Sequence, residues 1–281
     1  MRVSYYPGCS LEGTAKEYDE STRAVCQALE IELAELEGWN CCGATSAHCT
    51  DDFLSLALPA RNLSIAERKG LDLVVPCAAC YQRLKVAEKK LAQNPLPDFS
   101  YEGKIKVKNL IDFYSQEELL EKLSRGVKKP LAGLRVACYY GCLLVRPPKV
   151  TDAVNYEDPQ NMDELMNLVG AESVNWCYKT DCCGGSLLLS RPDIVIRLIQ
   201  RILDAALEAG AECVVTCCPM CQSNLDIRQR ELSKETGRDY NVPIFHFTEL
   251  LGLALGSPGI TRWLNRHLVS PRELLGAKGL L

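Results

Sequence analysis

One arrangement of cysteines occurs twice in the chain and constrains its fold more than any other feature. Each copy contains a lone cysteine, then an adjacent pair followed by glycine, then a Cys-x-x-Cys element. The members are Cys9, Cys41, Cys42, Cys77 and Cys80 in the first half, and Cys142, Cys182, Cys183, Cys218 and Cys221 in the second. From the adjacent pair onward, equivalent cysteines lie 141 residues apart. Equal offsets at successive positions indicate an internal repeat, which sets the architecture.

Strand and helix patterns recur with the same period. The runs typical of strands are RVSYY, IELAEL, LDLVVP and KIKVKNL in the first half, and LRVACYY, AESVNW, AECVVT and VPIFHF in the second. Helical patterns occur near residues 14–30, 161–169, 192–209, 220–235 and 247–254. Asp51 or Asp52 is expected to cap a further helix that Gly70 ends. The alternation predicts an α/β fold of two pseudo-symmetric domains, each a small, mostly parallel sheet flanked by helices.

All three cysteine elements of each half follow a predicted strand. In open α/β sheets, ligands gather beyond the carboxyl ends of the strands. We therefore expect three distant stretches of each half to converge on one point.

The segment GVKKPLAGL, with its glycines and proline, separates the two periodic regions. It predicts one domain over residues 1–130 and a second over residues 131–256. Residues 257–281 form a tail outside the repeat, with four Lys or Arg residues against one acid. This tail is a packed terminal helix or an exposed tail, or else a docking segment for a partner subunit.

The cysteine content is high for a chain of this size. There are 16 cysteines in 281 residues, and 47% of the chain is hydrophobic, so a core can form without disulfides. The N-terminus lacks the apolar region of a signal peptide, and no apolar run is long enough to span a bilayer. We expect a cytoplasmic protein whose cysteines serve metal binding or redox chemistry. The net charge of −4 offers no basic excess for a nucleic-acid partner.

Five thiolates in each half exceed the needs of simple metal sites. A structural zinc site takes four tetrahedral ligands, and an ordinary cubane iron–sulfur cluster also takes four. About five negative charges are balanced by several irons rather than by one divalent ion. Neighbouring side chains in an extended chain point to opposite faces, so the adjacent pair favours an open cluster. Multi-iron clusters are the favoured interpretation, with zinc plus redox thiols, or purely structural cysteines, as alternatives.

Six cysteines lie outside the repeated pattern. Cys26, Cys138 and Cys213 lie in apolar periodic stretches and are expected to be core residues. The other three lie close to the motifs and are possible additional ligands: Cys49, Cys177 and Cys217.

The chain has three histidines. His48 lies between ligand positions and is a candidate for donating a proton to a thiolate product, or a simple turn residue. His246 ends the fourth strand of the second half and is a second catalytic candidate. His267, in the tail, is expected to be solvated.

The doubled motif resembles the tandem CCG, or cysteine-rich, domains of the heterodisulfide reductase B subunit over roughly residues 1–256. The stretches YYPGC, LPARNLSIAE and HFTELLG are similar as well. The resemblance implies that each half binds one noncubane [4Fe-4S] cluster through its five repeated cysteines. It also implies an enzyme, in which a disulfide lies between the two clusters and is reduced, or a thiol pair is oxidised.

In that family, electrons come from a ferredoxin-like C subunit, which is supplied by a flavin-containing A subunit. This chain contains no cubane ferredoxin motif and no flavin-binding fingerprint of its own. The resemblance therefore implies a partner that delivers electrons. An electron-transfer and interaction subunit without its own disulfide chemistry is the alternative function.

Overall fold

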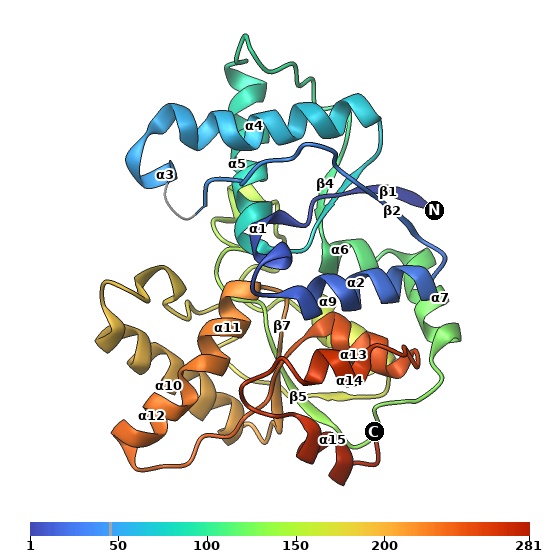
Figure 1. The fold of residues 1–281 in the computed structure, drawn as a ribbon, viewed down its shortest axis with the longest axis vertical. Helices are drawn as coiled ribbons and strands as arrows, with labels where there is room; N and C mark the ends of the chain where they lie inside the picture. The colour runs from blue at the N-terminus through green and yellow to red at the C-terminus, as the bar shows by residue number, and fades with distance from the viewer. Residues whose placement is uncertain (45–46) are drawn as a thin grey trace.

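The computed structural model describes residues 1–44 and 47–281 and contains a parallel sheet in each half of the chain (Figure 1). The first sheet has the strand order β2-β1-β3-β4 and the second has the order β6-β5-β7-β8, so the repeat extends to topology. All neighbouring strands run parallel. The strands are β1 (Arg2–Tyr5), β2 (Glu32–Glu35), β3 (Leu73–Val75), β4 (Val107–Asn109), β5 (Arg135–Tyr139), β6 (Glu172–Ser173), β7 (Cys213–Thr216) and β8 (Ile244–His246). The predicted α/β fold with two pseudo-symmetric domains is confirmed.

Helices of the first half connect and flank the first sheet. They are α1 (Gly8–Glu12), α2 (Lys16–Ala28), α3 (Ala47–Thr50), α4 (Asp52–Lys69), α5 (Ala78–Gln93), α6 (Leu110–Tyr114) and α7 (Glu117–Gly126). The ends of α4 agree with the sequence prediction. The Asp51 carboxylate accepts a hydrogen bond from the Leu54 amide at 2.7 Å, which satisfies a free N–H group of the first turn. Gly70 follows the helix at a φ of 67°, where glycine avoids the steric strain of a side chain.

The second half has the same pattern with one difference from the prediction. Its helices are α8 (Pro148–Thr151), α9 (Asn161–Leu168), the 3-10 turn η1 (Gly185–Leu187), α10 (Pro192–Glu208), α11 (Pro219–Ile227), α12 (Gln229–Thr236), α13 (Phe247–Ala254), α14 (Ile260–Leu264) and α15 (Arg272–Ala277). The helix expected over 220–235 is divided at Arg228 into α11 and α12. Asp226 accepts backbone hydrogen bonds from the tail, and Gln229 binds the carbonyl of Val242. These long-range contacts hold both sides of the break, and helical periodicity cannot reveal them.

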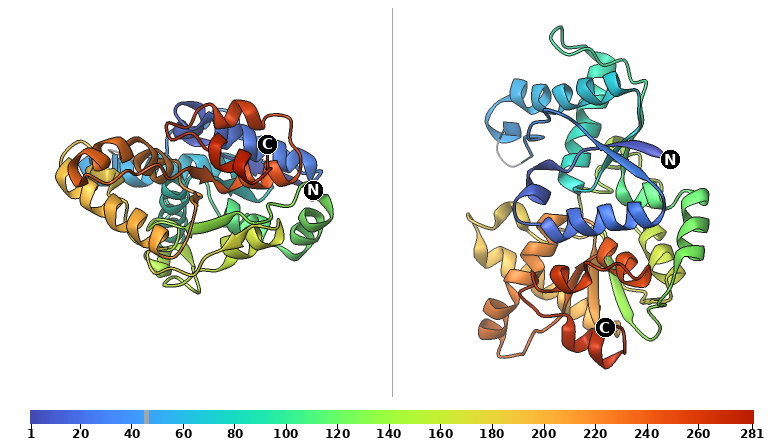
Figure 2. Two further views of the ribbon diagram at one scale, coloured as in Figure 1. Left: turned by 90° about the horizontal axis from the view of Figure 1, so that it is seen from below. Right: turned by 45° about the vertical axis from the view of Figure 1, so that its right-hand side comes forward.

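The two halves pack against each other through helices rather than through their sheets. Helix α13 of the second half lies along α2 of the first, as both views in Figure 2 show. The hydroxyls of Ser21 and Thr248 are 2.6 Å apart across this contact. One hydrophobic core includes buried residues of both sheets. The domain limits at 130 and 256 stay predictions, and the shared core joins the two lobes.

The tail packs on both halves of the chain. Arg262 and Arg266 form ion pairs with Glu20 on α2, at 2.8 and 2.9 Å. The prediction that His267 is solvated is wrong, because its Nε2 atom lies 2.9 Å from the carboxylate of Glu249 in the interior. The sequence offered no sign of this pairing, because Glu249 lies in α13 whereas His267 lies in the loop between α14 and α15. The tail is therefore a packed terminal segment rather than an exposed one.

Candidate functional site

The lone cysteines and the Cys-x-x-Cys elements directly follow the carboxyl ends of four strands, as predicted. The adjacent pairs come later in the chain than the prediction placed them, several residues after the ends of β2 and β6. Cys9 lies in α1, just after β1, and Cys142 follows β5. Cys77 and Cys218 directly precede α5 and α11, which start after β3 and β7. The second cysteine of each Cys-x-x-Cys element therefore lies in the first turn of a helix, near free N–H groups and the positive end of the helix dipole.

The structure brings the five cysteines of the first half into one group. The sulfurs of Cys42 and Cys80 are 3.3 Å apart. Hydrogen bonding to the Cys41 and Cys80 thiols lowers the pKa of Cys42 to about 4. Hydrogen bonding to Cys42 and Cys77 raises the pKa of Cys80 well above its usual range. Cys9 joins the group through its neighbour Gly8, because a Cβ atom on Gly8 would lie 3.0 Å from the sulfur of Cys80.

The second half repeats this arrangement. The sulfurs of Cys183 and Cys221 are 3.6 Å apart. Hydrogen bonding to Cys142 lowers the pKa of Cys182 to about 6, and hydrogen bonding to Cys221 lowers the pKa of Cys218. We call the two groups the first and second quintet. The adjacent pair of the second quintet divides its contacts, because Cys182 faces the lone cysteine and Cys183 faces the Cys-x-x-Cys element.

A glycine after each adjacent pair turns the backbone toward the sulfurs. Gly43 and Gly184 have φ values of 77° and 80°. Their amides lie 3.4 and 3.3 Å from the sulfurs of Cys41 and Cys182. The positive φ explains why glycine is required here. Each amide provides a hydrogen bond that stabilises a thiolate.

A second pair of glycines leaves room for the sulfurs. Gly8 and Gly141 have φ values of 71° and 68°. A Cβ atom on either would lie 3.0 or 3.1 Å from the sulfur of Cys80 or Cys221. The neighbouring tyrosines, Tyr6 and Tyr139, donate hydrogen bonds to the carbonyls just before the adjacent cysteine pairs. These contacts tie each lone-cysteine loop to the loop of the adjacent pair.

A cavity of about 210 Å³ lies between the two halves. All five cysteines of the second quintet line it. The first half contributes Ala44, His48, Ala78 and Ala79, which belong to the segments that carry the first quintet. Ala79 and Met220 are equivalent in the repeat and both line the cavity. The cavity therefore lies between the two lobes, but it is lined by the cysteines of the second quintet and by none of the first.

The two candidate histidines lie in different places. His48 lines the cavity, and its ring nitrogen Nε2 lies 3.4 Å from the sulfur of the exposed Cys49. His246 is fully buried at the start of α13, where its ring stacks on Tyr18 at 4.0 Å. His246 is absent from the residues that line the cavity. Only His48 is placed to meet a molecule bound there.

The cysteines outside the two quintets lie in different surroundings, some in the core and some at the surface. Cys26, Cys138 and Cys213 are buried, which confirms them as core residues. Cys177 is exposed beside a separate groove, with Glu157 and Asp158.

Cys217 is buried next to the second quintet, but its thiol points to the carbonyl of Tyr140 at 3.7 Å. Cys49 lies beside His48 at the surface. Neither Cys49 nor Cys217 lines the cavity, although each is next in sequence to a residue that does.

Tyr18 is a site residue that the sequence did not suggest. Its hydroxyl lies 3.2 Å from the carbonyl oxygen of Pro76 and 3.0 Å from that of Cys217. These carbonyls are 141 residues apart and each precedes a Cys-x-x-Cys element. One hydroxyl therefore lies between equivalent points of the two lobes. The sequence repeat shows that the two carbonyls occupy equivalent positions, but it does not show that one hydroxyl lies near both.

The donor set decides which metal groups fit the quintets. Within residues 1–44 and 47–281, no three Cys, His, Asp or Glu side chains are arranged to hold a single metal ion. Each quintet instead offers five sulfur donors, three of them buried. Thiolates are the usual ligands of iron–sulfur clusters, and backbone amides near sulfur stabilise the negative charge. The residues fit an iron–sulfur cluster in each half.

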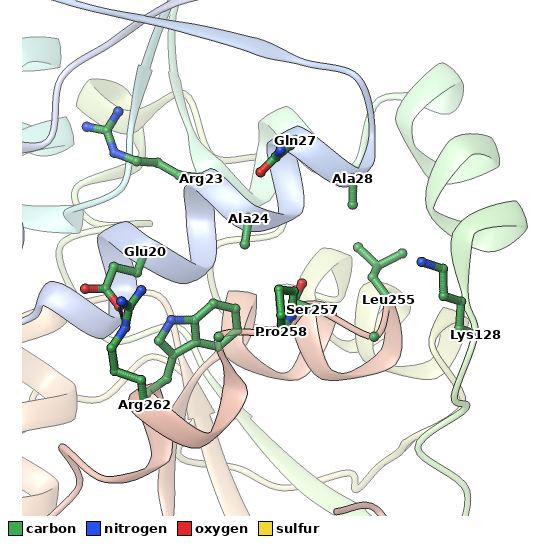
Figure 3. Close-up of a pocket in the computed structure, with 13 residues that line it drawn as sticks. Glu20, Arg23, Ala24, Gln27, Ala28, Lys128, Leu255, Ser257, Pro258 and Arg262 are labelled. Atoms are coloured by element: carbon green, nitrogen blue, oxygen red, sulfur yellow. Dashed lines mark ion pairs between the residues drawn. The ribbon is translucent and has the colours of Figure 1, made fainter.

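A larger groove lies away from the cysteines. It measures about 720 Å³ and lies between α2 and the α13–α14 segment (Figure 3). Glu20, Arg262 and Trp263 line its wall, and no cysteine does. The groove therefore takes no part in the site around the quintets.

Comparisons with known proteins agree with this arrangement. The cysteine-rich domain family, CCG, matches residues 3–85 and 136–226. A protein named 8-methylmenaquinol:fumarate reductase membrane anchor subunit, from Wolinella succinogenes, is 34% identical over 96% of this chain and 98% of its own. The B subunit of the ferredoxin:CoB-CoM heterodisulfide reductase from Methanosarcina mazei is 32% identical over 91% of this chain and 89% of its own. A protein described as like the heterodisulfide reductase B subunit, from Archaeoglobus profundus, is 30% identical over 91% of each chain.

A solved structure supports the fold alone. It is a hypothetical protein from Helicobacter pylori, with a TM-score of 0.76 and 14% sequence identity. The match covers 96% of this chain and 52% of that protein. With the family match in both halves and relatives that align over nearly the full chain, the protein belongs to the cysteine-rich CCG domain family, as a tandem member related to the heterodisulfide reductase B subunit.

Proposed function

We propose that this chain is the disulfide-converting subunit of a heterodisulfide reductase-like complex. The observation that carries the proposal is one cavity between two lobes, with a sulfur quintet in each lobe. The second quintet lines the cavity directly, and the first half reaches it through segments that carry the first quintet. A substrate with two sulfur atoms matches a site that has one quintet in each lobe. The relatives named as B subunits of heterodisulfide reductases support the same assignment.

The cofactors of the proposed reaction are two noncubane [4Fe-4S] clusters. Each quintet would hold one of them through its five thiolates. When bound, the clusters would supply the two electrons that cleavage of an S–S bond consumes. The reaction takes up two electrons and two protons and converts a disulfide into two thiols. With electrons flowing the other way, the same site would oxidise two thiols.

The residues of this chain have distinct tasks in that reaction. The amides of Gly43 and Gly184 stabilise thiolates of the quintets. Ala44, Ala78 and Ala79 leave space on the first-half side of the cavity. His48 lines the same space and is the proposed proton donor to a thiolate product. His246 has no such part, because its ring faces Tyr18 rather than the cavity.

The electrons must come from another protein, because this chain supplies no flavin or cubane-cluster motif. The proposed partners are a ferredoxin-like C subunit and a flavin-containing A subunit, in the cytoplasm. A small disulfide or thiol pair is the proposed substrate.

An electron-transfer subunit without disulfide chemistry is the second candidate function. The relative named as a fumarate reductase membrane anchor subunit favours it, because its name includes no disulfide substrate. Among the described residues of the present chain, no helix has the length and apolarity to cross a membrane. The two candidates share the clusters and differ in whether a substrate reaches them.

Anaerobically purified protein tests the proposal. We expect equal amounts of iron and sulfide, as two [4Fe-4S] clusters require, and an EPR signal that changes when a thiol or disulfide is added. Clusters whose EPR signal ignores every thiol and disulfide would support the electron-transfer candidate. One zinc ion per half, without iron, would overturn both.

A further inference from the structure

Two equivalent positions near the quintets hold different chemical groups. Arg83 on α5 and Asn224 on α11 are 141 residues apart, and each lies three residues past the last cysteine of its quintet. Residues three apart on a helix lie on the same face. Both side chains therefore start from the helix face that carries Cys80 or Cys221.

The second half shows where this position points. The Asn224 amide donates a hydrogen bond to the carbonyl of Cys183 at 2.8 Å, and the side chain is buried. Position 224 therefore contacts the loop of the adjacent cysteine pair. Asn224 brings no net charge. Hydrogen bonding to Cys221, and to a smaller extent to the Asn224 side chain, lowers the pKa of Cys183, so the second site has a neutral donor at this position.

The first half has a cation at the equivalent helix position. The half-buried Arg83 side chain donates from Nε to Gln82 at 2.9 Å. Within the described parts of the chain, no carboxylate forms an ion pair with it. Arg83 lies three residues after Cys80 on α5, so its side chain leaves the helix on the face that carries this sulfur. Burial lowers the pKa of Arg83, while negative charge on Cys42 and Cys49 raises it, in agreement with that position.

The residues between the Cys-x-x-Cys cysteines add to the difference. Ala78 and Ala79 occupy these positions in the first half, and Pro219 and Met220 occupy them in the second. Proline has no backbone N–H group, so the first turn of α11 offers one fewer donor to nearby sulfurs than the first turn of α5. Both differences make the surroundings of the first quintet more favourable to negative charge.

We infer that Arg83 is a tuning residue that makes the first quintet the preferred location for an added electron. The inference rests on the proposed function, because it requires a redox cluster in each quintet. A nearby cation stabilises the reduced, more negative state, which raises the reduction potential of the first site above that of the second. Electrons that enter the protein therefore collect in the first half, on the side of the cavity that His48 lines.

Potential measurements on neutral and charged variants test this inference. EPR-monitored redox titrations would use Cys183→Ala protein, so that only the first site contributes a signal. In that background Arg83→Gln is expected to lower the midpoint potential by about 59 mV, a tenfold change in a one-electron equilibrium. Arg83→Lys, which keeps the charge, is expected to restore most of the potential. Lys90→Gln is the matched control, because Lys90 is an exposed cation farther along the same helix.

The second site supplies the internal comparison. In Cys42→Ala protein, Arg83→Gln is expected to leave the potential of the remaining site unchanged. An unchanged first-site potential in Arg83→Gln, or an equal shift in Lys90→Gln, overturns the inference while the clusters themselves persist. Absence of iron and sulfide from the unmodified protein would instead overturn the proposed function. Loss of the first signal in Arg83→Gln but not in Arg83→Lys supports the role of the charge, and loss in both contradicts it.

Discussion

In the first half of the molecule, the segments that carry the sulfur quintet include a cation and a histidine; in the second half the equivalent positions hold an amide and an exposed leucine. Arg83 is replaced by Asn224, and His48 by Leu189. The helices that follow the last strand of each sheet, α6 and α13, also differ. Each has an acid in its first turn, but Asp112 binds Asn161 whereas Glu249 binds His267. The backbone geometry of the lobes is thus shared, and their charge is not.

The shared features all concern the position of the sulfurs. Gly8 and Gly141 leave space for a sulfur, and Gly43 and Gly184 direct an amide toward one. The features that differ are side chains around the quintets, and they leave the backbone turns that hold the sulfurs unchanged. The comparison teaches that duplication kept two equal cradles while the charge and accessibility around them diverged.

Removal of one sulfur from each lobe in turn is expected to give the largest effect. Cys42→Ala and Cys183→Ala are equivalent positions in the repeat. Each variant should lose the cluster of its own half, because an open cluster cannot keep its irons without the buried sulfur. The measured iron and sulfide contents would then fall to about half. The stability of the whole chain should fall as well, because one hydrophobic core spans both lobes.

Cys177→Ala provides the control, because Cys177 is exposed and lies outside both quintets. It should retain all of its iron. Loss of iron from both lobes after one substitution would show that the two sites are not separate binding units.

Alanine at the cradle glycines tests the shared geometry. Gly141→Ala should lose cluster from the second half, because the new Cβ atom would lie 3.1 Å from the sulfur of Cys221. Gly133→Ala is a matched control with a φ of 77° and open space around its Cα. Both variants should lose about 1–2 kcal/mol of unfolding free energy through backbone strain. Only Gly141→Ala should also lose iron, and equal iron in the two variants would contradict the proposed crowding.

Sequence patterns predicted the parts of the molecule that depend on local order or on exact spacing. The strands, the ends of α4 at Asp51 and Gly70, and the convergence of both quintets followed from periodicity and offsets. The burial of His267 could not be predicted, because it depends on a contact with Glu249 in α13 that no pattern around His267 indicates. The role of Tyr18 was missed for a similar reason, since its hydroxyl meets a carbonyl 199 residues away.

The pairing of His267 with Glu249 makes the second half sensitive to pH. Burial alone would lower the pKa of His267, but the carboxylates of Glu249, Asp226 and Glu17 raise it to about 9. A raised pKa in the folded state stabilises the protein fully below the unfolded value of about 6.5, and this stabilisation is lost as pH rises through about 9. The corresponding loss is at most about 3 kcal/mol of unfolding free energy. Denaturation at pH 6.5 and 9.5 would measure it.

The variant His267→Gln removes the titrating group and provides the comparison. Its unfolding free energy should be lower than that of the unmodified protein at pH 6.5 and should change less between the two pH values. An equally steep pH dependence in this variant would show that other groups are responsible. The matching place beside Asp112 in the first half is occupied by Asn161, which does not titrate.

The smallest effect is expected from the one hydroxyl that touches both lobes. Tyr18→Phe would remove a buried donor lying near the carbonyls of Pro76 and Cys217, at a cost of about 1–2 kcal/mol of unfolding free energy. Tyr139→Phe removes a hydroxyl whose acceptor, Asp181, lies in the same half. Amide hydrogen exchange should therefore accelerate at the starts of both α5 and α11 in Tyr18→Phe, but only in the second lobe in Tyr139→Phe. If Tyr18→Phe changes exchange in one lobe only, its hydroxyl does not join the two cradles, and their relative position depends on the packing of α2 against α13 instead.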